Sequence, residues 1–257
     1  MDNPIPNPTP APAAPPSAAP PAPPAVTMPV LYRSATVLNR EVHAGLRLAR
    51  QSDFRFAQGT NSVPALLSEF EALAAYCPIG FGRDADGRFF PVAVLGFADG
   101  ENLFVGQGGQ WLAPYVPAWI RRYPFMLAAT TRPGETGYLL LADLEAPHFA
   151  AADGTPLFAG EGPDAIMRQA IDFCLRVEQE LAATRAFAAA LAEANVLVEA
   201  RDGDARAAVS FWTVDPDRVA DLPAETLVAW RSSGALRGAL RVVASNRRWR
   251  GLAALRV

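Results

Sequence analysis

The chain has 257 residues, of which 51% are hydrophobic and 19% charged, and this composition excludes a wholly disordered protein. Its net charge of −3 gives no overall attraction to nucleic acid, so we expect no nucleic-acid partner. Two histidines and two cysteines are too few for a multi-histidine metal centre or a disulfide framework. We therefore expect no metal, no cofactor, and free, buried thiols at Cys77 and Cys174.

The N-terminal segment differs from the rest in composition. Residues 1–29 hold 12 of the 24 prolines, and proline both fixes φ and removes a backbone donor. We therefore predict a disordered Ala/Pro-rich tail over 1–27 and one folded domain over 28–257. The start of the chain has neither a basic nor an apolar region of the signal-peptide type, and no apolar run is long enough to cross a bilayer. These features predict a cytoplasmic protein without a transmembrane segment.

The first half of the folded part is predicted to consist mainly of strands. Residues 30–38 and 41–50 have strand character, and a helix is expected from Ser62 as N-cap, with Pro64 in its first turn, to a stop before Pro78. Three further predictions complete this half: a strand over 89–97, a tight turn at Asp99 and Gly100, and a return strand over 102–105.

The second half is predicted to be mainly helical. Pro117 opens a short helix that ends before Pro124, and residues 138–144 form a strand. Apolar residues then recur at three- and four-residue steps over 163–195, which predicts one long amphipathic helix. A strand over 207–214 and two helices over 223–256, broken around Gly234, end the chain. Strands early and helices late predict an α+β fold: a mixed or antiparallel sheet from the N-terminal half, packed with a long helix and further C-terminal helices.

Several segments together resemble the SapC-like family of bacterial proteins. The resemblance runs from about residue 30 to the C-terminus, and RRYPF is its most diagnostic part. It departs from the family pattern at Cys77, which interrupts a Tyr-Pro pair, and in the extra N-terminal tail. The segments are NSVP at 61–64, SEF at 68–70, YCPI at 76–79, PVAVLGF at 91–97, GENLFV at 100–105, Trp111, YVPA at 115–118, RRYPF at 121–125, LF at 157–158, Thr184 with Phe187, and TVD at 213–215.

The resemblance implies a partner more readily than a reaction. Family members accompany flavin-dependent halogenase-like proteins and outer-membrane receptors, and the family name derives from surface-layer systems. The resemblance therefore implies a non-catalytic accessory or binding protein with a protein partner, either a flavoprotein or a receptor, surface-layer or uptake system. It transfers no catalytic residues to this chain.

The best candidate for recognition is the aromatic and arginine-rich stretch around RRYPF. Adjacent guanidiniums at a helix end, surrounded by aromatic rings, are suited to binding a carboxylate or an aromatic side chain. The alternative is that the arginines cap the last helical carbonyls while the rings lie in the core. The candidate binding residues are Trp111, Tyr115, Trp119, Arg121, Arg122, Tyr123 and Phe125.

A second hypothesis makes the protein an enzyme of unrecognised type. His43 and His148 are the side chains whose ordinary pKa lies nearest neutrality, although neither sits in a nucleophile or metal motif. His43, Asn61 and Glu69 could converge near the start of the first helix as a polar or metal-binding site, or as a structural hydrogen-bond network.

Three other patterns have simpler interpretations. The glycines over 106–109 fit a hairpin turn better than a phosphate loop, and residues 84–87 fit an exposed turn better than a calcium loop. From Thr226 onward the chain carries seven arginines and no acid. This C-terminal segment could dock on an acidic protein, a nucleic acid or a lipid surface, or its arginines could form internal salt bridges or a solvated face.

Overall fold

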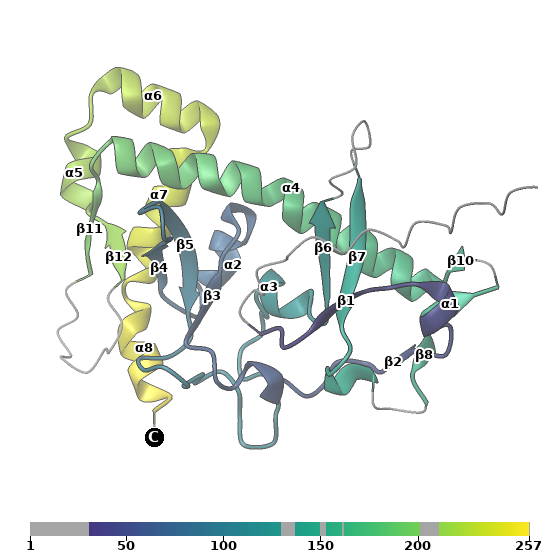
Figure 1. The fold of residues 1–257 in the computed structure, drawn as a ribbon. Helices are drawn as coiled ribbons and strands as arrows, with labels where there is room; N and C mark the ends of the chain where they lie inside the picture. Colours follow the sequence, from purple (N-terminus) through teal and green to yellow (C-terminus); the bar gives the residue numbers. More distant parts are fainter. Residues whose placement is uncertain (1–30, 130–136, 150–152, 161, 201–210, 257) are drawn as a thin grey trace, which may run out of the picture.

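The computed structural model describes residues 31–129, 137–149, 153–160, 162–200 and 211–256. The long helix α4, Ala165–Glu193, runs along the molecule, and two separate antiparallel sheets lie against its two halves (Figure 1). Asp164 caps its first turn by accepting a hydrogen bond from the Ala165 amide. Its buried residues recur along one side and include Met167, Cys174, Phe187 and Leu191, as the apolar periodicity requires.

The larger sheet has five strands in the order β11-β12-β4-β5-β3, all antiparallel. Strands β4 and β5 form a hairpin whose turn uses Gly87 at a φ of +77°, a conformation that glycine adopts without strain. The main core lies between this sheet, the C-terminal half of α4 and the last helices. The strands are β3 (Ser62–Pro64), β4 (Ile79–Arg83), β5 (Phe89–Val94), β11 (Leu197–Glu199) and β12 (Trp212–Val214).

The smaller sheet has three strands in the order β1-β7-β6. It encloses a second core against the N-terminal half of α4, where Met167 and Cys174 are buried with Phe125 and Leu127. Two short strand pairs lie beside it, β2 with β8 and β9 with β10. The strands are β1 (Ala35–Val37), β6 (Phe125–Ala129), β7 (Tyr138–Asp143), β2 (Arg47–Leu48), β8 (Thr155–Pro156), β9 (Phe158–Ala159) and β10 (Gly162–Pro163).

Short helices connect the strands, and four helices close the chain. Gly234, at a φ of +83°, separates α6 from α7 and allows the backbone to reverse there. The short elements are α1 (Arg40–His43), α2 (Phe70–Leu73), α3 (Ala118–Arg121) and the 3-10 helices η1 (Arg55–Ala57), η2 (Leu67–Glu69) and η3 (Pro147–Phe149). The last four are α5 (Pro216–Ala220), α6 (Ala224–Ser233), α7 (Ala235–Ser245) and α8 (Arg248–Ala254).

The α+β class is confirmed, with antiparallel sheets from the first half, one long helix and further C-terminal helices. The predictions of a helix opening at Pro117, of the strand over 138–144 and of a break at Gly234 are confirmed within a few residues. The tail over 1–27, the start of the first strand and residues 207–210 of a later strand lie outside the described residues.

Three local predictions were wrong. Residues 41–50 contain the end of α1 and then the short strand β2, because Asn39 caps a helical turn by accepting from the Glu41 amide. Residues 102–105 form no return strand; only Val105 makes an isolated bridge, to Trp111.

The third error concerns the expected helix from Ser62. Ser62–Pro64 is instead the edge strand β3, which pairs Ser62 with Val94 and Pro64 with Val92 of β5. Proline is tolerated there because an edge strand leaves one side of its backbone without a sheet partner. The helical turns begin only at Leu67, in η2, and continue into α2.

Candidate functional site

The carboxylate of Glu69 joins two segments that are distant in sequence. It lies at the end of η2 and is 4% exposed. One oxygen, Oε1, accepts hydrogen bonds from the Tyr115 hydroxyl at 2.7 Å and the Ala118 amide at 2.6 Å. The other, Oε2, accepts from the Leu66 amide at 3.2 Å. Glu69 therefore fastens the start of α3 to the start of η2, beside the middle of α4 where Leu66, Ala118 and Val177 are packed together.

Arg121, at the end of α3, is the exposed part of this network. Its Nε donates to the Val116 carbonyl at 2.9 Å, and its Nη2 donates to the Tyr115 hydroxyl at 3.0 Å. The guanidinium carbon lies 5.2 Å from the ring centre of Tyr115 and 5.1 Å from that of Phe173. With 42% of its side chain exposed, Arg121 presents a guanidinium whose position is already fixed on one side.

Tyr115 carries the contact between these two charges. Its hydroxyl donates to Glu69 and accepts from Arg121. Burial, followed by the negative charge of Glu69, raises the pKa of Tyr115 to about 12. The hydroxyl therefore keeps its proton at neutral pH and serves as a fixed hydrogen-bond link rather than as an acid.

Arg122, the next residue, belongs to the interior. It is 4% exposed, its guanidinium carbon lies 3.4 Å from the ring centre of Trp119, and its Nη1 lies 3.4 Å from Glu178 Oε1. The Nε of Arg122 and the indole Nε1 of Trp119 are both buried without a hydrogen-bond partner among the described residues. Arg122 thus forms a part-buried ion pair with Glu178 of α4 and stacks on Trp119.

Tyr123 and Phe125 are also buried, at 5% and 4% exposed. The Tyr123 hydroxyl donates to Asp143 Oδ2 at 3.2 Å, and its ring stacks on Phe56 with ring centres 4.3 Å apart. Phe125 begins β6 and faces the smaller core. Three of the seven candidate binding residues, Arg122, Tyr123 and Phe125, therefore contribute to packing, as in the alternative that places the rings in the core.

Of the other four candidate binding residues, Arg121 is exposed and the three aromatic residues are half-buried. Trp111 donates from its indole nitrogen to the Tyr115 carbonyl at 2.8 Å and stacks on Phe104 with ring centres 5.5 Å apart. Trp119 lies under the Arg122 guanidinium. Solvent therefore reaches Arg121 and parts of Trp111, Tyr115 and Trp119, and a partner would meet this smaller set.

The structure does not bring His43 to Asn61 and Glu69. His43 lies in α1, towards the opposite end of the molecule from β3 and α2 (Figure 1), and its Nδ1 accepts from the Asn39 amide at 3.0 Å. Asn61 donates to Asp99 Oδ1 at 3.1 Å. In the parts of the chain that the structure describes, no three His, Cys, Asp or Glu side chains are grouped to hold a metal ion.

The two cysteines are free and buried, as predicted. Burial is the main cause that raises the pKa of Cys77 to about 12 and of Cys174 to about 11. Both therefore remain as unreactive thiols at neutral pH.

His148, in η3, is 6% exposed and lies edge-on to Phe56 and Tyr123, with ring centres 5.3 Å apart in each case. Neither ring nitrogen has a hydrogen-bond partner among the described residues. Burial lowers the pKa of His148 to about 4, against a smaller opposing effect of Asp53. The imidazole is therefore neutral at pH 7 and acts as a packed aromatic ring.

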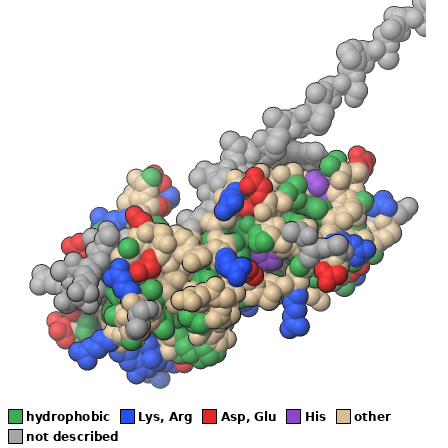
Figure 2. Space-filling view, turned by 90° about the horizontal axis from the view of Figure 1, so that it is seen from below, with side chains coloured by type: hydrophobic (Ala, Val, Ile, Leu, Met, Phe, Trp, Pro, Cys, Tyr) green, Lys and Arg blue, Asp and Glu red, His purple; other side chains and the backbone are tan. Residues whose placement is uncertain are grey.

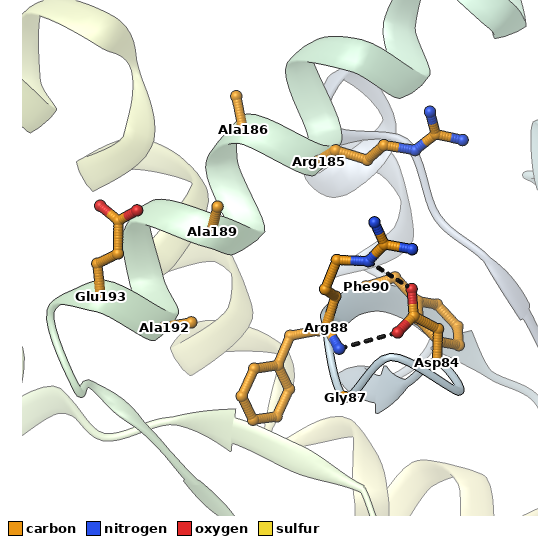
Figure 3. A pocket seen from close by; sticks show the side chains of 10 residues that line it. Asp84, Gly87, Arg88, Phe90, Arg185, Ala186, Ala189, Ala192 and Glu193 are labelled. Atoms are coloured by element: carbon orange, nitrogen blue, oxygen red, sulfur yellow. Dashed lines mark hydrogen bonds and ion pairs between the residues drawn. The ribbon is translucent and has the colours of Figure 1, made fainter.

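Sequence reasoning missed a hollow of about 830 Å³ between the β4–β5 turn and the C-terminal half of α4 (Figure 3). Asp84 accepts from the backbone amide and the Nε of Arg88, which holds that guanidinium on the same side of the hollow as Arg185 (Figure 3). The short side chains of Ala186, Ala189 and Ala192 on α4 leave this space open, and no sequence motif indicates it. Its lining includes Asp84, Gly87, Arg88, Phe89, Phe90, Arg185, Ala186, Ala189, Ala192 and Glu193.

The described chain is thus an α+β protein in which two antiparallel sheets share one long helix, with an exposed, fixed arginine between them. The sequence model of the SapC family matches residues 38–252, and the chain belongs to that family. Comparisons with curated proteins and with solved structures found no match. Among the described helices, none combines the length and the apolar character needed to cross a membrane.

Proposed function

We propose that this protein is a non-catalytic accessory protein that binds a partner protein through Arg121. The observation that carries the proposal is the fixed geometry of this guanidinium, which is hydrogen-bonded to Val116 and Tyr115 and is 42% exposed. Arginine has five N–H donors, and the two contacts from Nε and Nη2 leave others for a carboxylate.

The fixed position favours binding because less side-chain freedom is lost when a partner arrives. Glu69 lies 3.8 Å from the guanidinium, but its oxygens already accept hydrogen bonds from Tyr115, Ala118 and Leu66. Its charge therefore orients Arg121 without occupying its outer face. The rings of Tyr115 and Phe173 lie beside the same guanidinium and suit an apolar or aromatic neighbour of that carboxylate.

The partner that we propose is a flavin-dependent halogenase-like protein, with a surface-layer or uptake component as the alternative. Family membership supports a partner of this kind, since the resemblance implies such an association. A carboxylate on the partner's surface, next to an apolar side chain, is the complementary feature that Arg121 requires.

Binding of the purified partner to immobilised protein tests the proposal. Arg121→Gln keeps a polar side chain but removes the charge, and we expect the Kd to rise by about tenfold or more. Arg250→Gln, at an exposed position of α8, is the matched control and should leave the Kd unchanged. Equal affinity for wild type and Arg121→Gln, with both proteins folded, would refute the role of Arg121.

A further inference from the structure

Helix α7 has one sealed face and one open face. Gly238, Ala239 and Val242 are buried, and a Cβ at Gly238 would come within 2.7 Å of side-chain atoms of Leu67 and Phe187. On the other face Leu240 is 54% exposed, although burying a leucine side chain is favourable by about 2 kcal/mol. The open face therefore keeps apolar surface in contact with solvent.

Two hollows lie beside α7, one on the open face and one where α7 meets η2 and α2. The first has a volume of about 580 Å³ and is lined by Leu236 and Leu240 together with Arg231, Arg237 and Arg241. The second, of about 340 Å³, shares Arg237 and Arg241 with the first and continues past Gly234 and Gly238 to η2, α2 and Glu180. Because Arg237 and Arg241 line both, the two hollows are neighbours, and together they are called the α7 groove.

The positive charge of the α7 groove is only partly neutralised within the chain. Arg241 pairs with Glu71, whereas Arg231 and Arg237 form no ion pair with any carboxylate of the described chain. The first hollow has no acidic residue in its lining. Seen from below, arginine side chains gather along one border of the end that carries the C-terminal helices (Figure 2). Internal salt bridges thus account for only part of the C-terminal arginines.

We propose that the α7 groove binds an acidic amphipathic helix of a partner protein. Carboxylates of that segment would pair with Arg231 and Arg237, and its apolar side chains would cover Leu236 and Leu240. Arg231 and Arg237, which form no ion pair within the described chain, lie with the exposed Leu240 in the lining of the first hollow. This combination matches a helix that carries acidic and apolar residues on one face. This inference does not depend on the role of Arg121.

The shape and charge of the groove favour a protein segment over other anionic partners. A bilayer surface is flat on the scale of a helix and cannot enter a hollow, whereas side chains of a peptide can. A nucleic-acid backbone would have to pass Glu71 and Glu180 in the second hollow, where its phosphates would be repelled. A peptide can place its acidic residues at the arginines alone.

The test uses the full chain and a labelled synthetic peptide of about 18 residues, five helical turns long, with glutamate and leucine on one face. Fluorescence anisotropy gives its Kd. We expect the double variant Arg231→Glu/Arg237→Glu to raise the Kd by about tenfold or more. The double variant Arg247→Glu/Arg250→Glu makes the same change in net charge at exposed positions outside the groove lining, and should change the Kd by less than about threefold. Leu240→Asn should also weaken binding.

Several results would overturn the inference. If both double variants raise the Kd of the peptide equally, the attraction depends on net charge alone and the groove is not the binding site. If the wild-type protein does not bind the peptide, the partner is not an acidic protein segment. The same follows if it binds anionic phospholipid vesicles or duplex DNA more tightly than the peptide, and does so through Arg231 and Arg237. Circular dichroism melts of each variant separate loss of binding from loss of fold.

Discussion

The hydroxyl of Tyr115 lies 2.7 Å from Glu69 Oε1 and 3.0 Å from Arg121 Nη2, so one phenol links a buried acid to an exposed base. The acid fixes the phenol, and the phenol with the Val116 carbonyl fixes the guanidinium. The buried Glu69 thus positions the exposed Arg121 through Tyr115. The network predicts separate effects on stability and on binding when its members are changed one at a time.

Glu69 should be important for stability. Glu69→Ala leaves the Leu66 and Ala118 amides without their acceptor, and an unsatisfied buried donor costs about 1–3 kcal/mol. We expect the free energy of unfolding, measured in urea, to fall by about 3 kcal/mol. Glu71→Ala is the matched control, because Glu71 has 67% of its side chain exposed and forms its one ion pair within the described residues with Arg241, and it should cost less than about 1 kcal/mol. Equal losses would show that Glu69 does not hold the two segments together.

Tyr115 should make the fold sensitive to alkaline pH. Its pKa is raised from 10.0 to about 12, so the unfolded state loses the proton first and the folded state is favoured below pH 10. This contribution to stability is lost as the pH rises from about 10 to about 12. In Tyr115→Phe, the free energy of unfolding in urea should fall less between pH 10 and pH 12 than it does in the wild type. Identical curves for the two proteins over this range would contradict the assignment.

The sequence predicts the parts of the fold that depend on regular periodicity. The long run of apolar residues at helical spacing identified α4, and the β-rich stretch over 138–144 identified β7, because both patterns are local. The segment 62–64 could not be assigned in this way. Serine before proline is typical of a helix start, and only the pairing of Ser62 with Val94, a long-range contact, makes it a strand.

The candidate site was only partly predictable, for the same reason. The RRYPF segment identified the region but could not separate Arg121 from Arg122, since adjacent arginines have the same chemistry. Both guanidiniums lie against α4, Arg121 beside Phe173 and Arg122 beside Glu178. They differ in burial, because Arg122 is enclosed with Trp119 whereas Arg121 reaches Tyr115 and solvent. The contact of Glu69 with Tyr115 and Ala118 joins residues 46 and 49 positions apart, and no local pattern indicates it.

The two adjacent arginines should therefore respond differently to substitution. Arg122→Ala removes a buried guanidinium that pairs with the part-buried Glu178 and stacks on Trp119, and we expect a loss of about 2 kcal/mol in the free energy of unfolding. Arg121→Ala should cost less than about 1 kcal/mol, since its side chain is 42% exposed. Thermal or urea unfolding of the two single variants measures the difference. If both variants unfold like the wild type, Arg122 has no structural role.

The thiols should be protected in the folded protein. Cys77 is 3% exposed and Cys174 is 1% exposed, and burial raises the pKa of both, which lowers the thiolate fraction that reacts with alkylating agents. Iodoacetamide at pH 8 should modify neither cysteine in the native state and both in urea, as mass spectrometry of the intact chain would show. Rapid native modification of either residue would mean that its core opens readily.

His148 should make the protein less stable in mild acid. Its pKa falls from 6.5 to about 4 on folding, so the unfolded state binds the proton more readily. The contribution of the neutral imidazole to the free energy of unfolding is therefore complete above pH 6.5, and it is lost as the pH falls towards 4. The pKa difference corresponds to about 3 kcal/mol.

His148→Phe is the variant that isolates this effect. Phenylalanine keeps an aromatic ring against Phe56 and Tyr123 and removes two nitrogens that have no hydrogen-bond partner among the described residues. Urea unfolding at several values between pH 7 and pH 4 should show a smaller loss of stability for the variant than for the wild type. The two proteins should differ most at the acid end, because only the wild type has the buried imidazole of His148, which takes up a proton there on unfolding. Parallel curves would mean that His148 is reached by water and titrates in the folded state as it does in the unfolded chain.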